Sequence, residues 1–180
     1  MAVTPDEVFM SSQYLTLYKM IVLYMLRKSD GRLSKAQIYD FILDKEYTNF
    51  LTLQEVFGEL AESELITENS EGSRTFLKLT DAGSETLDFF GNRINPAIKE
   101  QIDTFFKENG MKIRDETSIS AFYKKTGENE YTTYLSASEG SSTLIDISIP
   151  VWNEEAAMAM CDNWKKKNSE IYQYLIRELM

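Results

Sequence analysis

The feature that most constrains the fold is a change in apolar periodicity at residue 65. Before it, apolar residues recur at helical spacing in three segments that begin near residues 14, 34 and 52. After it, Leu65–Glu68 has the pattern of a short strand, and Thr75–Leu79 alternates as a returning strand. Between them, Asn69–Ser73 is rich in turn-forming residues, and Gly72 can take a positive φ. We therefore expect three helices followed by a β-hairpin.

Two serine or threonine residues have the spacing of a helix-capping box. Ser34 is followed three residues later by Gln37, and Thr52 is followed by Glu55. In a capping box the hydroxyl accepts from a free amide of the first turn, and the longer side chain returns to the cap. We expect the second helix to open at Ser34 and to end near residues 43–45. The third should open at Thr52 and end near Ser63.

The two ends of this first half are assigned by the same reasoning. The first helix is expected over Tyr14–Arg27 and should be well buried, because it carries two apolar faces. Residues 1–12 lack a clear period and are expected to form a loose arm. Thr80 is expected to cap a fourth helix that contains Leu87, Phe89 and Phe90.

The second half begins at Asn95–Pro96, because proline disfavours a helical residue before it and suits the first turn of a new helix. Asn109–Gly110 is expected to stop that helix. Three strands and a final helix capped by Asn153 should follow. The strands are expected over residues 111–126, 131–138 and 144–151, and the helix to about residue 178. The predicted fold class is α+β, with a C-terminal α-β-β-β-α domain around a three-stranded antiparallel meander.

The stretch LSKAQIYDFI…LTLQEVFGELAESELI…RTFLKLTDAGSETL resembles the winged helix-turn-helix transcriptional regulators of the PadR-like and MarR-like kind. The resemblance lies in Leu60 with Leu65-Ile66, and in Leu79-Thr80-Asp81-Ala82-Gly83. Over its full length the chain also resembles an uncharacterised Gram-positive bacterial family, described as a domain of unknown function and regarded as predicted regulators. The resemblance implies a winged helix-turn-helix domain over residues 13–94, and a dimerisation or sensor domain over residues 95–180.

Composition excludes several classes of site. The chain has no histidine and one cysteine, so a Ser-His-Asp triad, a Cys-His pair and a cysteine or histidine zinc site are impossible within it. We expect no enzyme activity, no metal and no cofactor. No apolar run approaches the roughly 20 residues that span a bilayer, and Asp6 and Glu7 lie where a signal peptide is basic. A cytoplasmic protein without membrane contact is therefore expected.

The third helix is acidic where a DNA-reading helix is usually basic. Its outer face is expected to show Gln54, Glu55, Glu59 and Glu62, on a chain whose net charge is −10. Basic residues flank the second helix and the hairpin instead. A predicted dimeric, DNA-binding transcriptional regulator is one interpretation, and a winged-helix module that binds protein without DNA is the alternative. The candidate DNA-contacting residues are Arg32, Ser34, Lys35, Asn49, Thr52, Gln54, Glu55, Arg74 and Lys78.

A homodimer is expected because a single winged helix reads one half-site. The apolar surface of the first or the last helix would supply the interface. Cys161 on the last helix is expected to be a buried, inert thiol, since only Lys165 lies near enough to lower its pKa.

Overall fold

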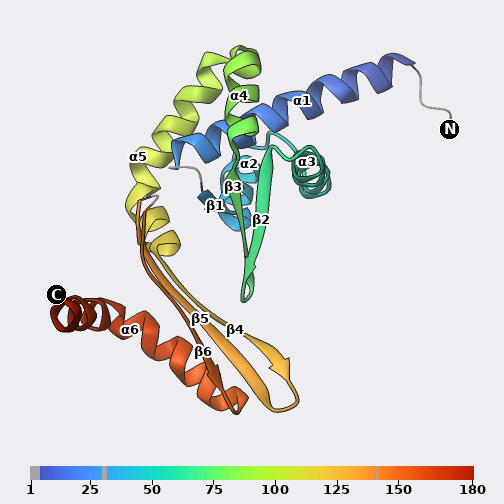
Figure 1. Cartoon of the computed structure of the whole chain (residues 1–180). Coiled ribbons are helices and arrows are strands. Elements are labelled where there is room, and N and C mark those ends of the chain that lie inside the picture. The colour runs from blue at the N-terminus through green and yellow to red at the C-terminus, as the bar shows by residue number, and fades with distance from the viewer. Residues whose placement is uncertain (1–4, 30–31, 141) are drawn as a thin grey trace. The chain divides into compact units, whose positions relative to one another are not determined.

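The computed structural model describes residues 5–29, 32–140 and 142–180 and has a mixed α+β architecture with two three-stranded antiparallel sheets (Figure 1). The chain divides into two compact units. The first comprises residues 1–70 and 74–113, and the second residues 71–73 and 114–180. This division lies later in the chain than the expected boundary at residues 94 and 95.

The first unit contains one sheet and most of the helices. Its sheet has the order β1-β3-β2, and β1 pairs antiparallel with β3 so that Arg32 lies opposite Lys78. The elements are α1 (Pro5–Lys28), β1 (Arg32–Ser34), α2 (Lys35–Asp44), α3 (Phe50–Glu62), β2 (Ile66–Glu71), β3 (Arg74–Leu79), α4 (Asp81–Phe90), the 3-10 turn η1 (Gly91–Arg93) and α5 (Pro96–Ser118). The last residue of β2 and residues 114–118 of α5 belong to the second unit.

Helix α1 forms the centre of this unit. Ile21, Val22 and Leu23 are consecutive and have no exposed surface, so the helix is enclosed on more than one face, as the two apolar stripes predicted. It packs against α3 and α4. The core continues through Phe41 of α2 and Phe57 of α3, each at most 1% exposed. Burial of these apolar side chains is the main stabilising contribution to the unit.

The beginning of the chain differs from its prediction. The loose arm expected over residues 1–12 is wrong for residues 5–12, which form the first turns of α1, and residues 1–4 lie outside the described part. Strand β1 was also not predicted. Its three residues are too short for a periodic pattern, and the strand exists because it pairs with β3.

The capping boxes had different outcomes. Ser34 caps α2 as predicted: its hydroxyl accepts from the Gln37 amide at 3.2 Å, and Gln37 accepts from the Ser34 amide at 2.9 Å. The box expected at Thr52 is wrong. The cap is Asn49, whose side-chain oxygen accepts from the Thr52 amide at 2.9 Å, so α3 begins one turn earlier, at Phe50.

The turn of the hairpin and the cap of α4 follow the prediction. Gly72 has a φ of +62°, which L-residues with a side chain rarely adopt. Strand β2 extends to Glu71, further than expected, so the turn is tighter. The Thr80 hydroxyl accepts from the Gly83 amide at 3.0 Å and caps α4.

Helix α5 corrects the expected boundary at Asn109–Gly110. The helix runs on to Ser118, so residues 111–118 are helical and not the start of a strand. The side-chain Nδ2 of Asn109 donates to the Phe105 carbonyl at 3.0 Å within the helix. Ile113 is 7% exposed and belongs to the hydrophobic core of the first unit, which we call the first core. A glycine inside a helix costs about 1 kcal/mol, and the burial of Ile113 offsets that cost.

The second unit is a three-stranded meander with one helix on it. Strands β4 (Ile119–Gly127), β5 (Glu130–Glu139) and β6 (Ser142–Val151) lie in that order, and α6 (Glu154–Leu179) covers one face. Asn153 caps α6, as predicted, by accepting from the Ala156 amide at 2.7 Å. Trp164 is 2% exposed, and its indole nitrogen donates to the Ser136 carbonyl at 3.1 Å. Over the part of the chain that the structure describes, no helix is both long and apolar enough to span a bilayer.

Candidate nucleic-acid interface

One face of the β1–β3–β2 sheet points away from the first core and carries basic side chains. Residues alternate between the faces of a strand. In β3, Leu77 and Leu79 pack in the core, so Arg74, Phe76 and Lys78 lie on the opposite side. We call this surface the outer sheet face and define it by Arg32, Arg74, Phe76 and Lys78.

Arg32 belongs to this face because β1 pairs with β3. It lies directly opposite Lys78, and its guanidinium carbon is 4.1 Å from the centre of the Phe76 ring. Phe76 is 5% exposed. Stacking on an aromatic ring holds a guanidinium in place without neutralising its charge. Phe76 was not identified from the sequence, since its role depends on the unpredicted strand β1.

Arg74 and Lys78 are the cations of this face that remain open to a ligand. Both are exposed, and neither forms an ion pair within residues 32–140. Lys35, at the start of α2, differs from them. Its Nζ lies 2.8 Å from a carboxylate oxygen of Glu68. A phosphate could use Lys35 only by displacing Glu68.

The basic residues at the end of α1 are also paired. Arg27 donates to Asp88 at 2.7 Å and to the Ser84 carbonyl at 2.5 Å. Lys28 lies 2.9 Å from Asp103, and that hydrogen bond is the main reason that the pKa of Lys28 is raised. The basic side chains at the end of α1 are therefore largely neutralised within the protein itself.

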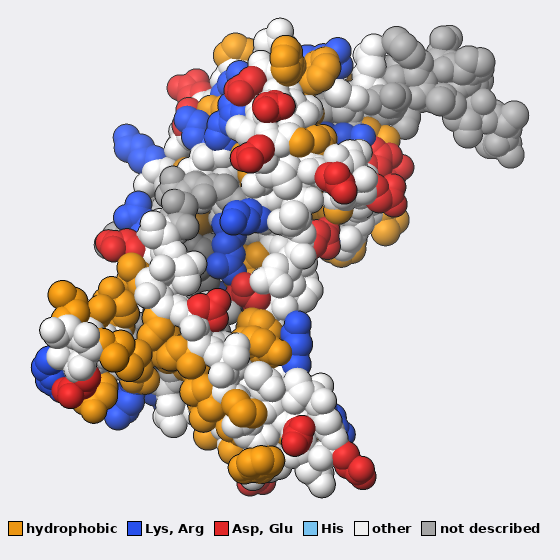
Figure 2. Space-filling view, in the orientation of Figure 1, with side chains coloured by type: hydrophobic (Ala, Val, Ile, Leu, Met, Phe, Trp, Pro, Cys, Tyr) orange, Lys and Arg blue, Asp and Glu red, His pale blue; other side chains and the backbone are white. Residues whose placement is uncertain are grey.

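The exposed face of α3 is acidic, as the sequence predicted. Gln54, Glu55 and Glu62 are exposed, and Glu59 pairs with Lys19 of α1. Figure 2 shows acidic side chains gathered over this helix. A phosphate backbone brought against α3 would meet like charge.

The first turn of α3 carries an apolar surface that the sequence did not reveal. Phe50 is 50% exposed and Leu51 is 79% exposed. Phe50 also stacks on Tyr39 of α2, with ring centres 4.7 Å apart. The capping-box spacing at Thr52 predicts a helix that begins there, and so it leaves these two residues outside the helix.

Three of the candidate DNA-contacting residues serve as helix caps or lie beside them. Ser34 is 5% exposed and its hydroxyl is engaged in the α2 cap. The Asn49 side chain caps α3, and Thr52 supplies the amide to that cap while its own side chain is half-buried. These side chains support the helix ends and do not lie on the outer sheet face.

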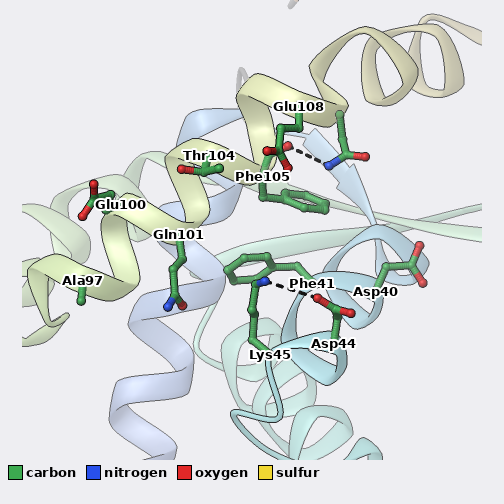
Figure 3. A pocket seen from close by; sticks show the side chains of 11 residues that line it. Asp40, Phe41, Asp44, Lys45, Ala97, Glu100, Gln101, Thr104, Phe105 and Glu108 are labelled. Atoms are coloured by element: carbon green, nitrogen blue, oxygen red, sulfur yellow. Dashed lines mark hydrogen bonds and ion pairs between the residues drawn. The ribbon is translucent and has the colours of Figure 1, made fainter.

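A cavity between α2 and α5 has the opposite character to the outer sheet face (Figure 3). Its volume is about 510 Å³. Phe41 and Phe105 meet there with ring centres 5.1 Å apart, and Lys45 lies 3.4 Å from Asp44. Carboxylates outnumber basic side chains in the lining of the cavity, whose other members are uncharged, so it repels anions and is unsuited to a nucleic-acid surface. The carboxylates are Asp40, Asp44, Glu100 and Glu108.

Comparison with known proteins finds one family. The model described as "Domain of unknown function (DUF4364)" matches residues 18–179. No curated protein and no solved structure matches the chain. The matched range includes nearly all of both units, and its description assigns no activity.

Proposed function

We propose the following function for this chain, which belongs to the DUF4364 family: residues 13–94 fold as a winged helix-turn-helix domain that binds double-stranded DNA through the outer sheet face. The order helix, short strand, two helices and hairpin supports this assignment of the domain. As a regulator of transcription, the protein would act as a homodimer.

The observation that carries the proposal is the pair of exposed cations on β3. Arg74 and Lys78 are four residues apart in the strand, an even spacing, so both point to one side of the hairpin. Phosphate contacts by Arg and Lys supply most of the affinity of such surfaces. The other basic residues near the helices are already bound to carboxylates: Arg27 to Asp88, Lys28 to Asp103 and Lys35 to Glu68.

Helix α3 has a small part in the proposed DNA contact. With Glu55 and Glu62 exposed, this helix would gain no phosphate contacts in a major groove. DNA would be contacted by the hairpin, and any base contact from α3 would be confined to Gln54.

The test measures binding to fluorescent duplexes that tile the DNA upstream of the protein's own gene, by anisotropy at about 50 to 200 mM salt. Arg74→Ala with Lys78→Ala should weaken binding at low salt and reduce the slope of log affinity against log salt by about two, since each phosphate contact contributes about 0.9. Lys166→Ala, an exposed lysine of α6, is the matched control and should leave both unchanged. No binding of any duplex by the wild-type protein at low salt would refute the proposal.

A second function is favoured by the apolar turn at the start of α3. Phe50 and Leu51 are exposed beside the acidic residues of the same helix, a combination that suits a basic segment with apolar side chains on another protein. The double variant Phe50→Ser, Leu51→Ser should lose a protein partner captured by the wild type from native extract, with duplex binding unchanged. Retention of that partner by the variant would exclude this docking surface.

A further inference from the structure

The two edges of the second unit's sheet differ in how well they are protected. In the order β4-β5-β6, each outer strand has one row of backbone N–H and C=O groups that no other described strand pairs. Strand β4 carries Lys124 and Lys125 and has an irregular register before Gly127. Lysines and bulges keep a sheet edge from pairing with another strand. Strand β6 also has a register shift, beside Leu144, and a proline, Pro150. Its central residues 145–149 carry no basic residue, proline or irregularity, so this central stretch is open to pairing.

The sequence of β6 is nearly symmetric about Ile147. Reading outward, Ile147 is flanked by Asp146 and Ser148 and then by Ile145 and Ile149. If a second β6 paired antiparallel with this centre, the isoleucines would face one another and each Asp146 would face the hydroxyl of a Ser148. A register centred one residue earlier would place the two Asp146 carboxylates opposite each other. Like charges directly opposite destabilise a strand pair.

The α6 side of β6 is apolar and incompletely covered. Ile145, Ile147 and Ile149 are only half-buried, because α6 packs mainly over β4 and β5. Figure 2 shows apolar side chains gathered along α6 and β6. The groove beside them has a volume of about 440 Å³ and is lined by Leu135, Ile147 and Ile149 of the sheet and by Ala156, Met160 and Trp164 of α6, among others.

We infer that the protein forms a two-fold dimer in which β6 pairs antiparallel with β6 of a second copy, centred on Ile147, to give a six-stranded sheet. The partner satisfies the open row of backbone groups and extends the isoleucine face beside the groove. A two-fold interface is self-complementary, and the sequence about Ile147 meets that requirement. The inference specifies the dimer of the proposed function, but it does not depend on DNA binding.

The oligomeric state of the 180-residue chain tests this interface. The chain has a mass of 20.8 kDa, and sedimentation velocity should show a species of twice that mass at micromolar concentration. Ser148→Asp would place an aspartate opposite Asp146 twice in each dimer and should weaken self-association about ten-fold. Ser148→Lys would place a lysine opposite Asp146 and should leave self-association as tight or tighter. Ser148 is exposed, and its β5 neighbour Tyr134 is neutral.

A charge exchange makes the test specific to the register. Asp146→Lys combined with Ser148→Asp restores opposite charges across the two-fold axis and should recover the affinity lost in Ser148→Asp alone. Circular dichroism of each variant checks that it is folded, and Ser148→Lys and the double variant keep the test valid if Ser148→Asp is not. A monomeric wild type at about 100 µM would overturn the inference. So would a folded Ser148→Asp variant that dimerises like the wild type, because another surface would then form the interface.

Discussion

The cations of the first unit fall into two groups, and their nearest carboxylates decide which of them a phosphate can reach. Lys35 lies 2.8 Å from Glu68, whereas Arg74 has no ion-pair partner among the described residues. A surface ion pair is worth about 0 to 1 kcal/mol, so the pair itself is weak. The carboxylate nevertheless stays beside the lysine and repels an incoming phosphate. The presence of a basic residue near a helix start is therefore a poor guide to a DNA contact unless its neighbours are known.

The lone thiol gives a prediction about reactivity. Cys161 is 6% exposed, and burial is the main cause that raises its pKa, with a smaller opposing effect of Lys165. The burial expected from the sequence is confirmed, and the expected lack of reactivity stays a prediction. Because the thiolate is the reactive form, the native protein should react with a disulfide reagent such as DTNB at neutral pH at least ten-fold more slowly than the unfolded protein.

The sign of the pH dependence follows from the same shift. A raised pKa in the folded state favours the protonated thiol, so its contribution to stability is complete below the ordinary pKa of cysteine and is lost as the pH rises through the folded value. Stopped-flow DTNB labelling from pH 7 to 10, with Cys161→Ser as the blank, measures how the labelling rates of the native and the unfolded protein change with pH. Equal native and unfolded rates at pH 7 would contradict the burial.

The start of α3 gives a prediction about one helix. Asn49 caps this helix and Thr52 lies inside it. Loss of an Asn cap costs about 1 kcal/mol, so Asn49→Ala should lower the free energy of unfolding by about that amount. Thr52→Ala leaves the capping oxygen in place and should cost under about 0.5 kcal/mol. Urea denaturation of both variants measures the difference, and an equal or larger loss in Thr52→Ala would restore the cap predicted there.

Segments with a long apolar period could be predicted from the sequence. The boundaries of α2, the hairpin with Gly72 and the Asn153 cap follow from local residues alone. Strand β1 and the end of α5 could not be predicted, because both depend on contacts distant in sequence. Arg32 reaches the outer sheet face only because β1 pairs with β3, and α5 continues past Gly110 because Ile113 is buried in the first core. The ion pairs around the candidate site could not be predicted either, because the partners of Lys28 and Lys35 lie on other elements.

The charge of the whole chain sets the conditions under which DNA could be bound. The net charge of −10 repels phosphate at long range, and at 0.1 M salt that repulsion is screened beyond about 10 Å. The proposed DNA binding would therefore have to come from short-range contacts on the outer sheet face. One such face offers few phosphate contacts, and so a single copy should bind DNA weakly. Two copies would double the contacts on one duplex.

Pairing through β6 and DNA binding through the outer sheet face would be coupled in a measurable way. When two binding faces are joined, the second contact becomes intramolecular, and overall affinity can exceed that of one face by about 10² to 10⁴. Ser148→Asp, which should weaken the β6 pairing, should therefore reduce affinity for a duplex with two half-sites by at least ten-fold at nanomolar protein. It should leave affinity for a single half-site unchanged, because Arg74 and Lys78 are intact. Anisotropy on the two duplexes, with Ser148→Lys as the matched control, measures the ratio. Equal loss on both would mean that the substitution disturbs the DNA-binding unit. Unchanged affinity for both duplexes would mean that each copy binds on its own.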